Sequence, residues 1–312
     1  METLTLMVRR KRRVADGIFE FELAHADGAA LPPFTAGAHI PVETPGGAMR
    51  HYSLSNDPSD RNRYVIAVKL ETEGRGGSRG MVEEVAEGDI LTVQPPENDF
   101  PLEEAGDYLL IAGGIGVTPI LSMARDLTRR GKPFRLVYCT RTKEQAAYLD
   151  ELTSGTLSGE VIIHHDGGDP DRVYDFWDLL EAPSRTHIYC CGPKPLMEEI
   201  RGMTGHWPPA AVHFEDFKPV DIFRAEDVAF DVTLSKSGKT VSVPVGHTIL
   251  DALRAADVHV ASSCESGTCG TCKTRYLSGD VDHRDMVLMP EEKDGYIMLC
   301  VSRATGELVL DL

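Results

Sequence analysis

"LLIAGGIGVTPILSMARDL", residues 109–127, decides the fold expected for the middle of the chain. An apolar run ends in a turn that contains Gly113, Gly114 and Gly116, and an amphipathic stretch that opens with Thr118 and a proline follows. Threonine caps helices and proline fits the first helical turn. The stretch therefore predicts a buried strand, a tight turn and a helix whose N-terminus offers amides to a pyrophosphate. Because the G-x-G-x-x-G spacing is missing, the turn alone fits a ligand-free turn equally well.

The same alternation of apolar runs and helical stretches continues on both sides of this stretch. Near-continuous apolar runs (DYLLIA, PFRLVYC, EVIIHH and THIYCC) alternate with helical stretches (PILSMARDLTRRG and KPLMEEIRGM) over residues 103–217. Strands that are apolar on both faces are typical of a parallel sheet covered by helices on both sides. We expect a doubly wound α/β domain here, with ligands at the carboxyl ends of its strands.

The ends of two later strands carry candidate nucleotide contacts. Cys191 opens "CGPKPLM" after the run THIYC, and we expect it beside the nicotinamide. Asp166, after the run EVIIHH, would bind ribose hydroxyls and repel a 2′-phosphate, which favours NADH. Arg141 favours NADPH instead as a phosphate partner, so this alternative stays open. His164 and His165 are adjacent on a strand and point to opposite faces, so we interpret them as structural.

The flanking segments predict two β-rich domains. Over residues 1–102 apolar and polar residues alternate with period two (IFEFEL, HIPVET, RYVIAVKL, DILTVQ), which predicts an antiparallel barrel. The basic run Arg9–Arg13 is interpreted there as a solvated strand end and turn. Residues 218–228 are charged and aperiodic, as in a linker. Residues 229–312 contain short strands (FDVTLS, TVSVPV) and one helix (ILDALRAA) before a cysteine-rich loop.

That loop has the spacing of a plant-type [2Fe–2S] site. Cys264, Cys269 and Cys272 are separated by four and two residues, and Cys300 follows much later. Glycines between them supply the backbone freedom of a tight wrap. A zinc site is less favoured because Cys300 has no nearby partner ligand. No signal peptide precedes the chain, so we expect a cytoplasmic protein, in which a disulfide set is disfavoured.

Two stretches of the barrel segment suit a flavin. In "RHYSL", Arg50 and Tyr52 share one strand face, so a guanidinium for a phosphate lies near a ring that packs on the isoalloxazine. Ser53 can bond a ring nitrogen. "GRGGSRG", residues 74–80, offers amides and Ser78 to an anion. Taken alone, this pattern also fits an ordinary half-buried strand.

The composition of the chain limits the kinds of molecule that it is expected to bind. The 312 residues have a formal net charge of −17. This charge disfavours nucleic acid and anionic membrane surfaces. The longest uncharged stretch, residues 108–124, contains glycines and a proline and is better explained as strand, turn and helix start than as a membrane span.

The motifs together resemble the phthalate dioxygenase reductase family, the flavin-dependent reductases of Rieske-type oxygenase systems. RxYSL, GGIGVTPILSMA, CCGP, HFEDF and CESGTCGTCK occur in this order over essentially the whole chain. The resemblance implies an FMN-binding barrel, an NADH-binding α/β domain and a C-terminal β-grasp ferredoxin domain. It implies FMN contacts from Arg50, Tyr52, Ser53, Val68, Lys69, Gly77 and Ser78, and NADH contacts from Gly114, Thr118, Asp166 and Cys191. It also implies cluster ligation by Cys264, Cys269, Cys272 and Cys300, and stacking of Phe217 on the flavin.

The implied activity is a relay from NADH through FMN and [2Fe–2S] to the terminal oxygenase of an aromatic dioxygenase or demethylase system. The cofactors carry the chemistry, while Ser53, Thr118, Cys191 and Phe217 position flavin and nicotinamide. We expect a monomer whose partner is that oxygenase. The alternatives are a standalone NADH:acceptor reductase and a non-catalytic iron–sulfur carrier.

Overall fold

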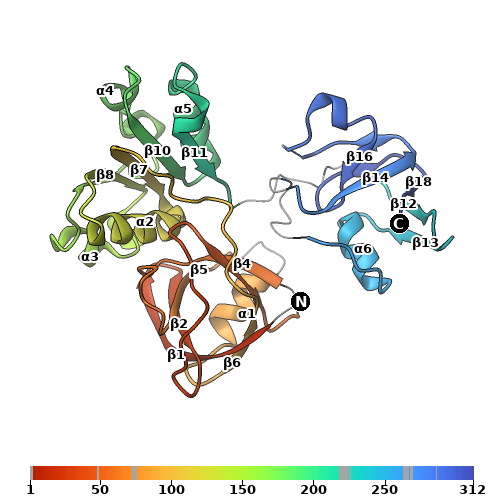
Figure 1. The fold of residues 1–312 in the computed structure, drawn as a ribbon, viewed down its shortest axis with the longest axis horizontal. Coiled ribbons are helices and arrows are strands. Elements are labelled where there is room, and N and C mark those ends of the chain that lie inside the picture. The colour runs from red at the N-terminus through yellow and green to blue at the C-terminus, as the bar shows by residue number, and fades with distance from the viewer. Residues whose placement is uncertain are drawn as a thin grey trace. The chain divides into compact units, whose positions relative to one another are not determined.

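The computed structural model describes residues 3–47, 49–71, 76–217, 224, 226–262, 267, 270–285 and 287–312. Two compact units make up the chain, Met1–Asp216 and Phe217–Leu312. The first unit contains a barrel followed by an α/β layer, and the second contains a smaller mixed sheet (Figure 1). Among the described residues, no helix has the length and apolar character needed to cross a membrane.

The barrel is an antiparallel sheet whose two edge strands meet. Its elements are β1 (Leu4–Ala15), β2 (Ile18–Ala24), β3 (His39–Glu43), β4 (Met49–Ser53), β5 (Tyr64–Lys69), α1 (Gly77–Glu83) and β6 (Ile90–Val93). The strand order is β4-β3-β6-β1-β2-β5. A bridge between Leu54 and Ile66 joins the end of β4 to β5 and closes the sheet. The predicted barrel is therefore present, and its interior is filled by side chains such as Phe21 and Ile40.

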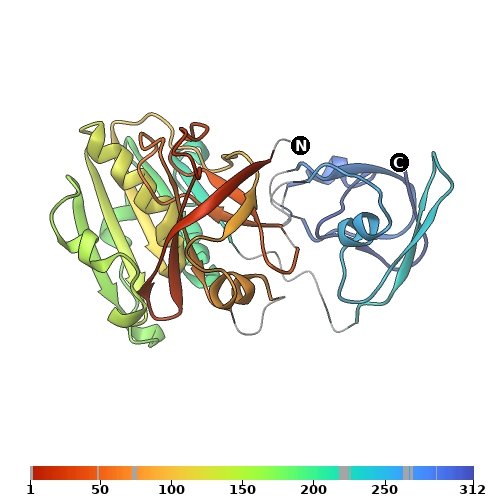
Figure 2. The ribbon, with the colours of Figure 1, turned by 90° about the horizontal axis from the view of Figure 1, so that it is seen from below.

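The basic run lies in the middle of β1, the long red strand of Figure 2. The run is solvent-exposed strand as expected, but the turn comes only after it, at residues 16–17, and not within it. Across the β1–β2 pair, Arg10 and Arg12 lie opposite Glu22 and Glu20, and Arg12 Nε is 2.5 Å from a Glu20 carboxylate oxygen. Opposite charges facing each other across a ladder stabilise strand pairing, so the charged residues extend the strand.

The α/β layer is a parallel sheet of β7 (Asp107–Gly113), β8 (Phe134–Thr140), β9 (Glu160–His165), β10 (Thr186–Cys191) and β11 (Val212–Glu215). The strand order is β11-β10-β7-β8-β9. Its helices are α2 (Val117–Arg129), α3 (Leu149–Thr153), α4 (Trp177–Leu180) and α5 (Lys194–Met203). Short 3-10 turns lie at η1 (Gly114–Gly116), η2 (Lys143–Gln145), η3 (Pro170–Arg172) and η4 (Pro209–Ala211).

Both faces of this sheet are buried, as its apolar runs predict. Leu110 of β7 packs in one core cluster with Leu127 of α2. Its neighbour Ile111 packs in another with Ile200 of α5. Adjacent strand residues thus face opposite helix layers, so the prediction of a doubly wound sheet is confirmed (Figure 1).

Over its described residues, the second unit has a mixed sheet and one α-helix. The order is β13 (Thr240–Val243), β12 (Phe230–Leu234), β18 (Leu308–Leu310), β14 (Lys273–Ser278) and β16 (Tyr296–Met298), with β12 and β18 parallel. β15 (Val281–Asp282) pairs with β17 (Arg303–Ala304), and η5 spans Pro290–Glu292. α6 (Ile249–Ala255) begins with a capping box of Thr248 and Asp251. This is the β-grasp arrangement that the resemblance implied.

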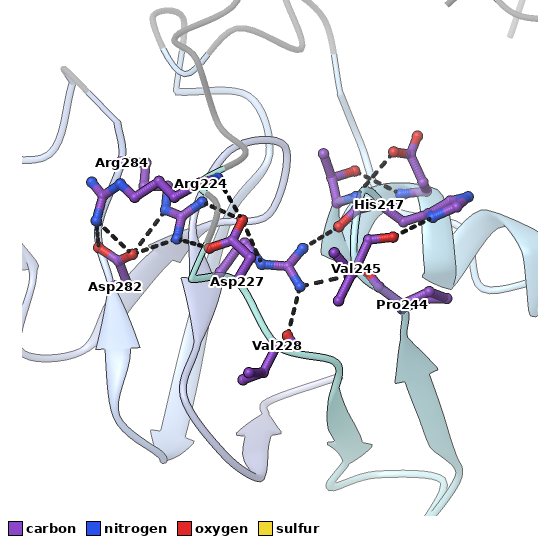
Figure 3. A network of polar contacts seen from close by, with 11 residues as sticks. Arg224, Asp227, Val228, Pro244, Val245, His247, Asp282 and Arg284 are labelled. Atoms are coloured by element: carbon purple, nitrogen blue, oxygen red, sulfur yellow. Dashed lines mark hydrogen bonds and ion pairs between the residues drawn. The ribbon is translucent and has the colours of Figure 1, made fainter.

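Buried charges fix the start of this unit to its body. Figure 3 shows the Arg284 guanidinium between Asp227 and Asp282. Arg284 donates to both oxygens of Asp227 at 2.6 and 2.9 Å and to Asp282 Oδ2 at 2.6 Å. The Arg284 and Asp227 side chains are 4% and 3% exposed. Arg303 Nη2 donates to Val228 O at 2.9 Å, so residues 226–228 are tied to the unit that follows them.

Candidate functional site

The strand order reverses between β7 and β10. From β7 the chain adds β8 and β9 on one side and then returns to place β10 and β11 on the other. In open α/β sheets, ligands bind beyond the carboxyl ends of the strands at such a reversal. Gly113 ends β7 and Cys191 ends β10, so the two motifs that suggested a nucleotide site lie at this point.

The two turns are packed backbone against backbone. A Cβ added to Gly116 would lie 2.5 Å from the carbonyl carbon of Cys191, and one added to Gly192 would lie 2.9 Å from Gly113 Cα. Gly114 has a φ of +54°, and a Cβ added there would meet nothing within 4 Å. The glycines thus bring the turns together and leave Gly114 open to an approaching group. This cradle fits a pyrophosphate.

Thr118 does not cap α2, contrary to expectation. The N-cap residue is Gly116, without a side-chain cap bond, because η1 runs directly into the helix. The Thr118 hydroxyl instead donates to Ile115 O at 3.1 Å. Thr118 still lies in the first turn of a 13-residue helix, next to the open glycine turn. The positive end of the helix dipole therefore still lies beside the open glycine turn, where it favours an anion.

Arg141 follows β8 and Asp166 follows β9, so they lie on two neighbouring loops. The amide of Gly168 donates to Asp166 Oδ1 at 2.6 Å, and the amide of Gly167 donates to Arg141 O at 2.8 Å. The two residues expected to decide the preference between NADH and NADPH thus lie beside one another. The preceding histidines have separate partners, since His164 Nε2 lies 2.7 Å from Arg172 O and His165 Nδ1 lies 2.7 Å from Thr140 Oγ1.

The predicted flavin residues gather where the barrel closes. Arg50, Tyr52 and Ser53 lie on β4, Val68 and Lys69 on β5, and Gly77 and Ser78 at the start of α1. Contacts join β4 to β5 and β5 to α1. A Cβ added to Gly77 would lie 3.1 Å from Arg50 Nε, so the guanidinium crosses this glycine closely. A guanidinium beside a glycine turn is a donor set that suits a phosphate.

The remaining side chains of this group have distinct environments. Burial raises the pKa of Tyr52 to about 12, so its phenol stays neutral. Ser53 and Val68 are buried. Lys69 pairs with Glu71 at 2.9 Å, and Ser78 Oγ accepts from the Glu71 amide at 3.1 Å. We call the place where β4 meets β5 the seam. Tyr52, Ser53 and Val68 are neutral groups within it, whereas Lys69 and Glu71 lie at the end of β5.

Glu215 is a site residue that sequence reasoning missed. It ends β11 in register with Cys191, and its buried Oε2 has no hydrogen-bond partner among the described residues. Burial, followed by the charge of Asp99, raises its pKa to about 8. Burial also raises the pKa of Cys191, so that group stays a thiol. The signal was present in HFEDF, where an acidic residue is the last residue of a strand at the ligand edge of the sheet.

Phe217 begins the second unit, and its side chain is 40% exposed. Its stacking on a flavin stays a prediction.

The second unit carries the cysteines. Cys264 and Cys269 lie outside the described residues. Cys272 and Cys300 are both 2% exposed, and the amide of Leu299 is 3.5 Å from Cys272 O, which brings their segments together. Gly267 and Gly270 have φ of +79° and +82°, the left-handed conformation that a tight wrap requires. Buried thiols on two adjoining segments form a soft ligand set that fits an iron–sulfur cluster.

Two family models match the parts of the chain that hold the predicted nucleotide site and the predicted cluster site. Residues 110–202 match the oxidoreductase NAD-binding domain, and residues 232–305 match the 2Fe-2S iron-sulfur cluster binding domain. The chain is 52% identical to the phthalate 4,5-dioxygenase oxygenase reductase subunit of Pseudomonas putida, over 98% of this chain and 96% of that one. The chain belongs to the phthalate dioxygenase reductase family.

Structural comparison extends this family assignment over the whole fold. The solved phthalate dioxygenase reductase, a modular structure for electron transfer from pyridine nucleotides to [2Fe-2S], superposes with a TM-score of 0.89 at 51% identity, covering 99% of this chain and 98% of that one. An intact type IV self-sufficient cytochrome P450 monooxygenase matches 99% of this chain with 41% of its own length, at 37% identity and a TM-score of 0.74. The predicted family and three-part fold class are confirmed, and the chain is an oxidoreductase.

Proposed function

We propose that the chain is the reductase component of an oxygenase system. It takes hydride from NADH, passes the electrons through FMN on the barrel to a [2Fe–2S] cluster, and delivers them singly to a separate terminal oxygenase. The name of the Pseudomonas putida relative and the electron path named for the solved reductase support this role. FMN, rather than another flavin, follows the resemblance to the family.

One observation carries the proposal. β5, which holds two predicted flavin contacts, touches η1, the glycine turn of the predicted nicotinamide site. Flavin and nicotinamide sites are thus neighbours within one compact unit. A bound flavin supplies the conversion of a two-electron hydride donor into two one-electron deliveries.

The chain's own residues bind and orient the two cofactors and exclude water from the space between them. The amides at the start of α2 hold the pyrophosphate, and Arg50 holds the flavin phosphate. Tyr52 offers a neutral ring to the flavin, while the protonated Cys191 and Glu215 line the nicotinamide end without adding negative charge. No protein acid or base is required, because proximity and orientation provide the acceleration.

The finer assignments are part of the proposal. The domains are residues 1–102, 103–217 and 229–312, joined by the linker 218–228. The FMN and NADH contacts and the four cysteine ligands are those named from the sequence, and Phe217 covers the flavin until nicotinamide displaces it. The protein acts as a monomer in the cytoplasm. Its net charge of −17 suits an oxygenase with a basic docking surface.

A second acceptor class has its own support. The whole chain resembles a part of a self-sufficient cytochrome P450 monooxygenase, so a haem oxygenase is a candidate partner beside the Rieske type. Reconstitution with purified oxygenases of both classes, followed by NADH-dependent product formation, separates the two.

Absorbance of the purified protein tests the relay itself. We expect a yellow-brown protein with flavin and iron–sulfur bands that NADH bleaches under anaerobic conditions. A colourless protein that contains zinc would overturn the proposal. If NADH bleaches the bands but neither class of oxygenase forms product in the reconstitution, the standalone NADH:acceptor reductase is favoured instead.

A further inference from the structure

One face of α2 runs from the predicted nicotinamide site toward the barrel. Thr118, Ser122, Arg125 and Arg129 follow one another at intervals of four, three and four residues. Such spacing places side chains in one stripe along a helix. The stripe begins beside the glycine turn, where the nicotinamide nucleotide is expected.

Farther along, the stripe bonds to the main chain of the barrel. The fully buried Ser122 donates from its hydroxyl to Asn56 O at 2.9 Å. Arg125 Nη1 donates to Ser55 O at 2.5 Å. Both acceptors are backbone carbonyls, so the bonds fix the position of the chain itself and not of a mobile side chain.

Ser55 and Asn56, whose carbonyls accept these bonds, follow β4, the strand that carries three predicted flavin contacts. Ser55 comes two residues after Ser53, and its amide donates to Val65 O of β5 at 2.8 Å. The Val65 amide in turn donates to Asn56 Oδ1 at 3.0 Å. The segment is thus bound to both seam strands, β4 by chain continuity and β5 by hydrogen bonds. Any shift of α2 against it is a shift against the predicted flavin site.

Arg125 is itself held in place. Its Nε and Nη2 donate to the two carboxylate oxygens of Glu151 on α3 at 2.8 and 2.5 Å. Tyr148 directly precedes α3, and its hydroxyl lies 3.4 Å from Ser55 Oγ. A bidentate partner fixes the plane of a guanidinium, so the third donor of Arg125 is aimed at Ser55 O before any ligand binds.

We propose that Ser122 and Arg125 are positioning residues for hydride transfer. They fix the distance and angle at which a nicotinamide held at the start of α2 meets a flavin held on β4 and β5. The inference rests on the proposed function. Because α2 rises about 1.5 Å per residue, Ser122 lies about 6 Å along the axis from Thr118, within the rigid part of the same helix. Misplacement by about 1 Å can slow a transfer about 100-fold.

The test uses the flavin-loaded full chain. In Ser122→Ala and Arg125→Met, anaerobic flavin reduction at saturating NADH should slow about 10- to 100-fold, while the NAD⁺ dissociation constant changes less than about threefold. The flavin difference spectrum that NAD⁺ induces reports ring overlap without turnover and should shrink in both. Ser122→Thr keeps the hydroxyl and should restore both readouts. Arg125→Lys keeps a charge but cannot hold both partners, so it should be intermediate.

Arg129→Met is the matched control. It removes the same charge from the same stripe, but Arg129 is half-exposed and bonds the side chain of Asp57 at 3.3 Å. We expect this variant to retain wild-type rates. Three results would overturn the inference: Ser122→Ala and Arg125→Met transferring hydride at wild-type rates, loss only through weaker NAD⁺ binding, or an equal loss in Arg129→Met. Should Arg125→Met not fold, Ser122→Ala and Arg125→Lys decide. Failure of NADH to reduce the wild-type flavin would contradict the proposed function instead.

Discussion

Gly116 and Cys191 touch through their backbones: a Cβ on Gly116 would lie 2.5 Å from the carbonyl carbon of Cys191. The turn after β7 and the end of β10 are thus one structural feature. Backbone atoms on both sides cannot move away as a flexible side chain could. The contact therefore couples stability and nucleotide binding at this position.

Gly116→Ala should lower the free energy of unfolding by about 3 kcal/mol, because overpacking against backbone forces both turns apart. The NAD⁺ dissociation constant should rise at least tenfold, since the same turn holds the pyrophosphate. Urea unfolding and NAD⁺ titration measure the two effects. Gly202→Ala is the control: its added Cβ on α5 meets nothing within 4 Å, and alanine should stabilise that helix by about 0.5–1 kcal/mol. Wild-type binding by Gly116→Ala would refute the shared role.

Glu215 should make the stability of the chain fall as pH rises. Its folded pKa is about 8 against an ordinary value of 4.5, so the folded state retains a proton that the unfolded state releases between these values. Stability from this group is full below pH 4.5 and is lost as pH rises through about 8. Glu215→Gln is neutral throughout and should gain stability relative to wild type from pH 5 to pH 9. Urea unfolding across this range measures the difference. Parallel curves would contradict the prediction.

The sequence predicted strands best where burial alone determines them. The runs DYLLIA and THIYCC lie in β7 and β10 because strands covered on both faces need continuous apolar residues. The turn predicted within Arg9–Arg13 was misplaced because Arg10 and Arg12 are paired with Glu22 and Glu20, which only the strand register brings opposite. α1 was not predicted, since GGSRG is a poor helix former and its helix depends on tertiary contacts.

The residues of the candidate site likewise fall into those that the sequence could identify and those that it could not. Residues whose chemistry shows in a local motif, such as Arg50 and the cysteines, could be named from the sequence. Ser122 and Arg125 could not, because a polar stripe on a helix reads as solvent-facing until the fold places a carbonyl opposite it. Glu215 likewise depends on the neighbouring β10 for its burial. Site residues that act through tertiary contacts leave little local signal.

Asp227 should stabilise the second unit against acid. Arg284 lowers the pKa of Asp227 to about 2, from an ordinary value of 3.8. A lowered carboxyl pKa contributes stability that is full above the ordinary value and is lost as pH falls toward 2. Asp227→Asn leaves Arg284 and Arg303 buried without this counter-charge and should cost about 3–5 kcal/mol at neutral pH. Denaturation followed by cluster absorbance measures this loss. Asp282→Asn, at a more exposed partner of Arg284, should cost about 1 kcal/mol, and equal losses would refute the assigned role of burial.

Cys300→Ser should separate the two halves of the relay. Cys300 is buried beside the segment of Cys272, and serine is a poor ligand for a cluster that thiolates hold. We expect loss of the iron–sulfur absorbance and of electron transfer to a one-electron protein acceptor. NADH should still reduce the flavin within about twofold of the wild-type rate, because that step occurs in the first unit. Cys190→Ser is the matched control, a buried thiol in the core of the α/β layer that should leave the cluster bands unchanged. If Cys300→Ser also abolished flavin reduction, the proposed order of electron transfer would be wrong.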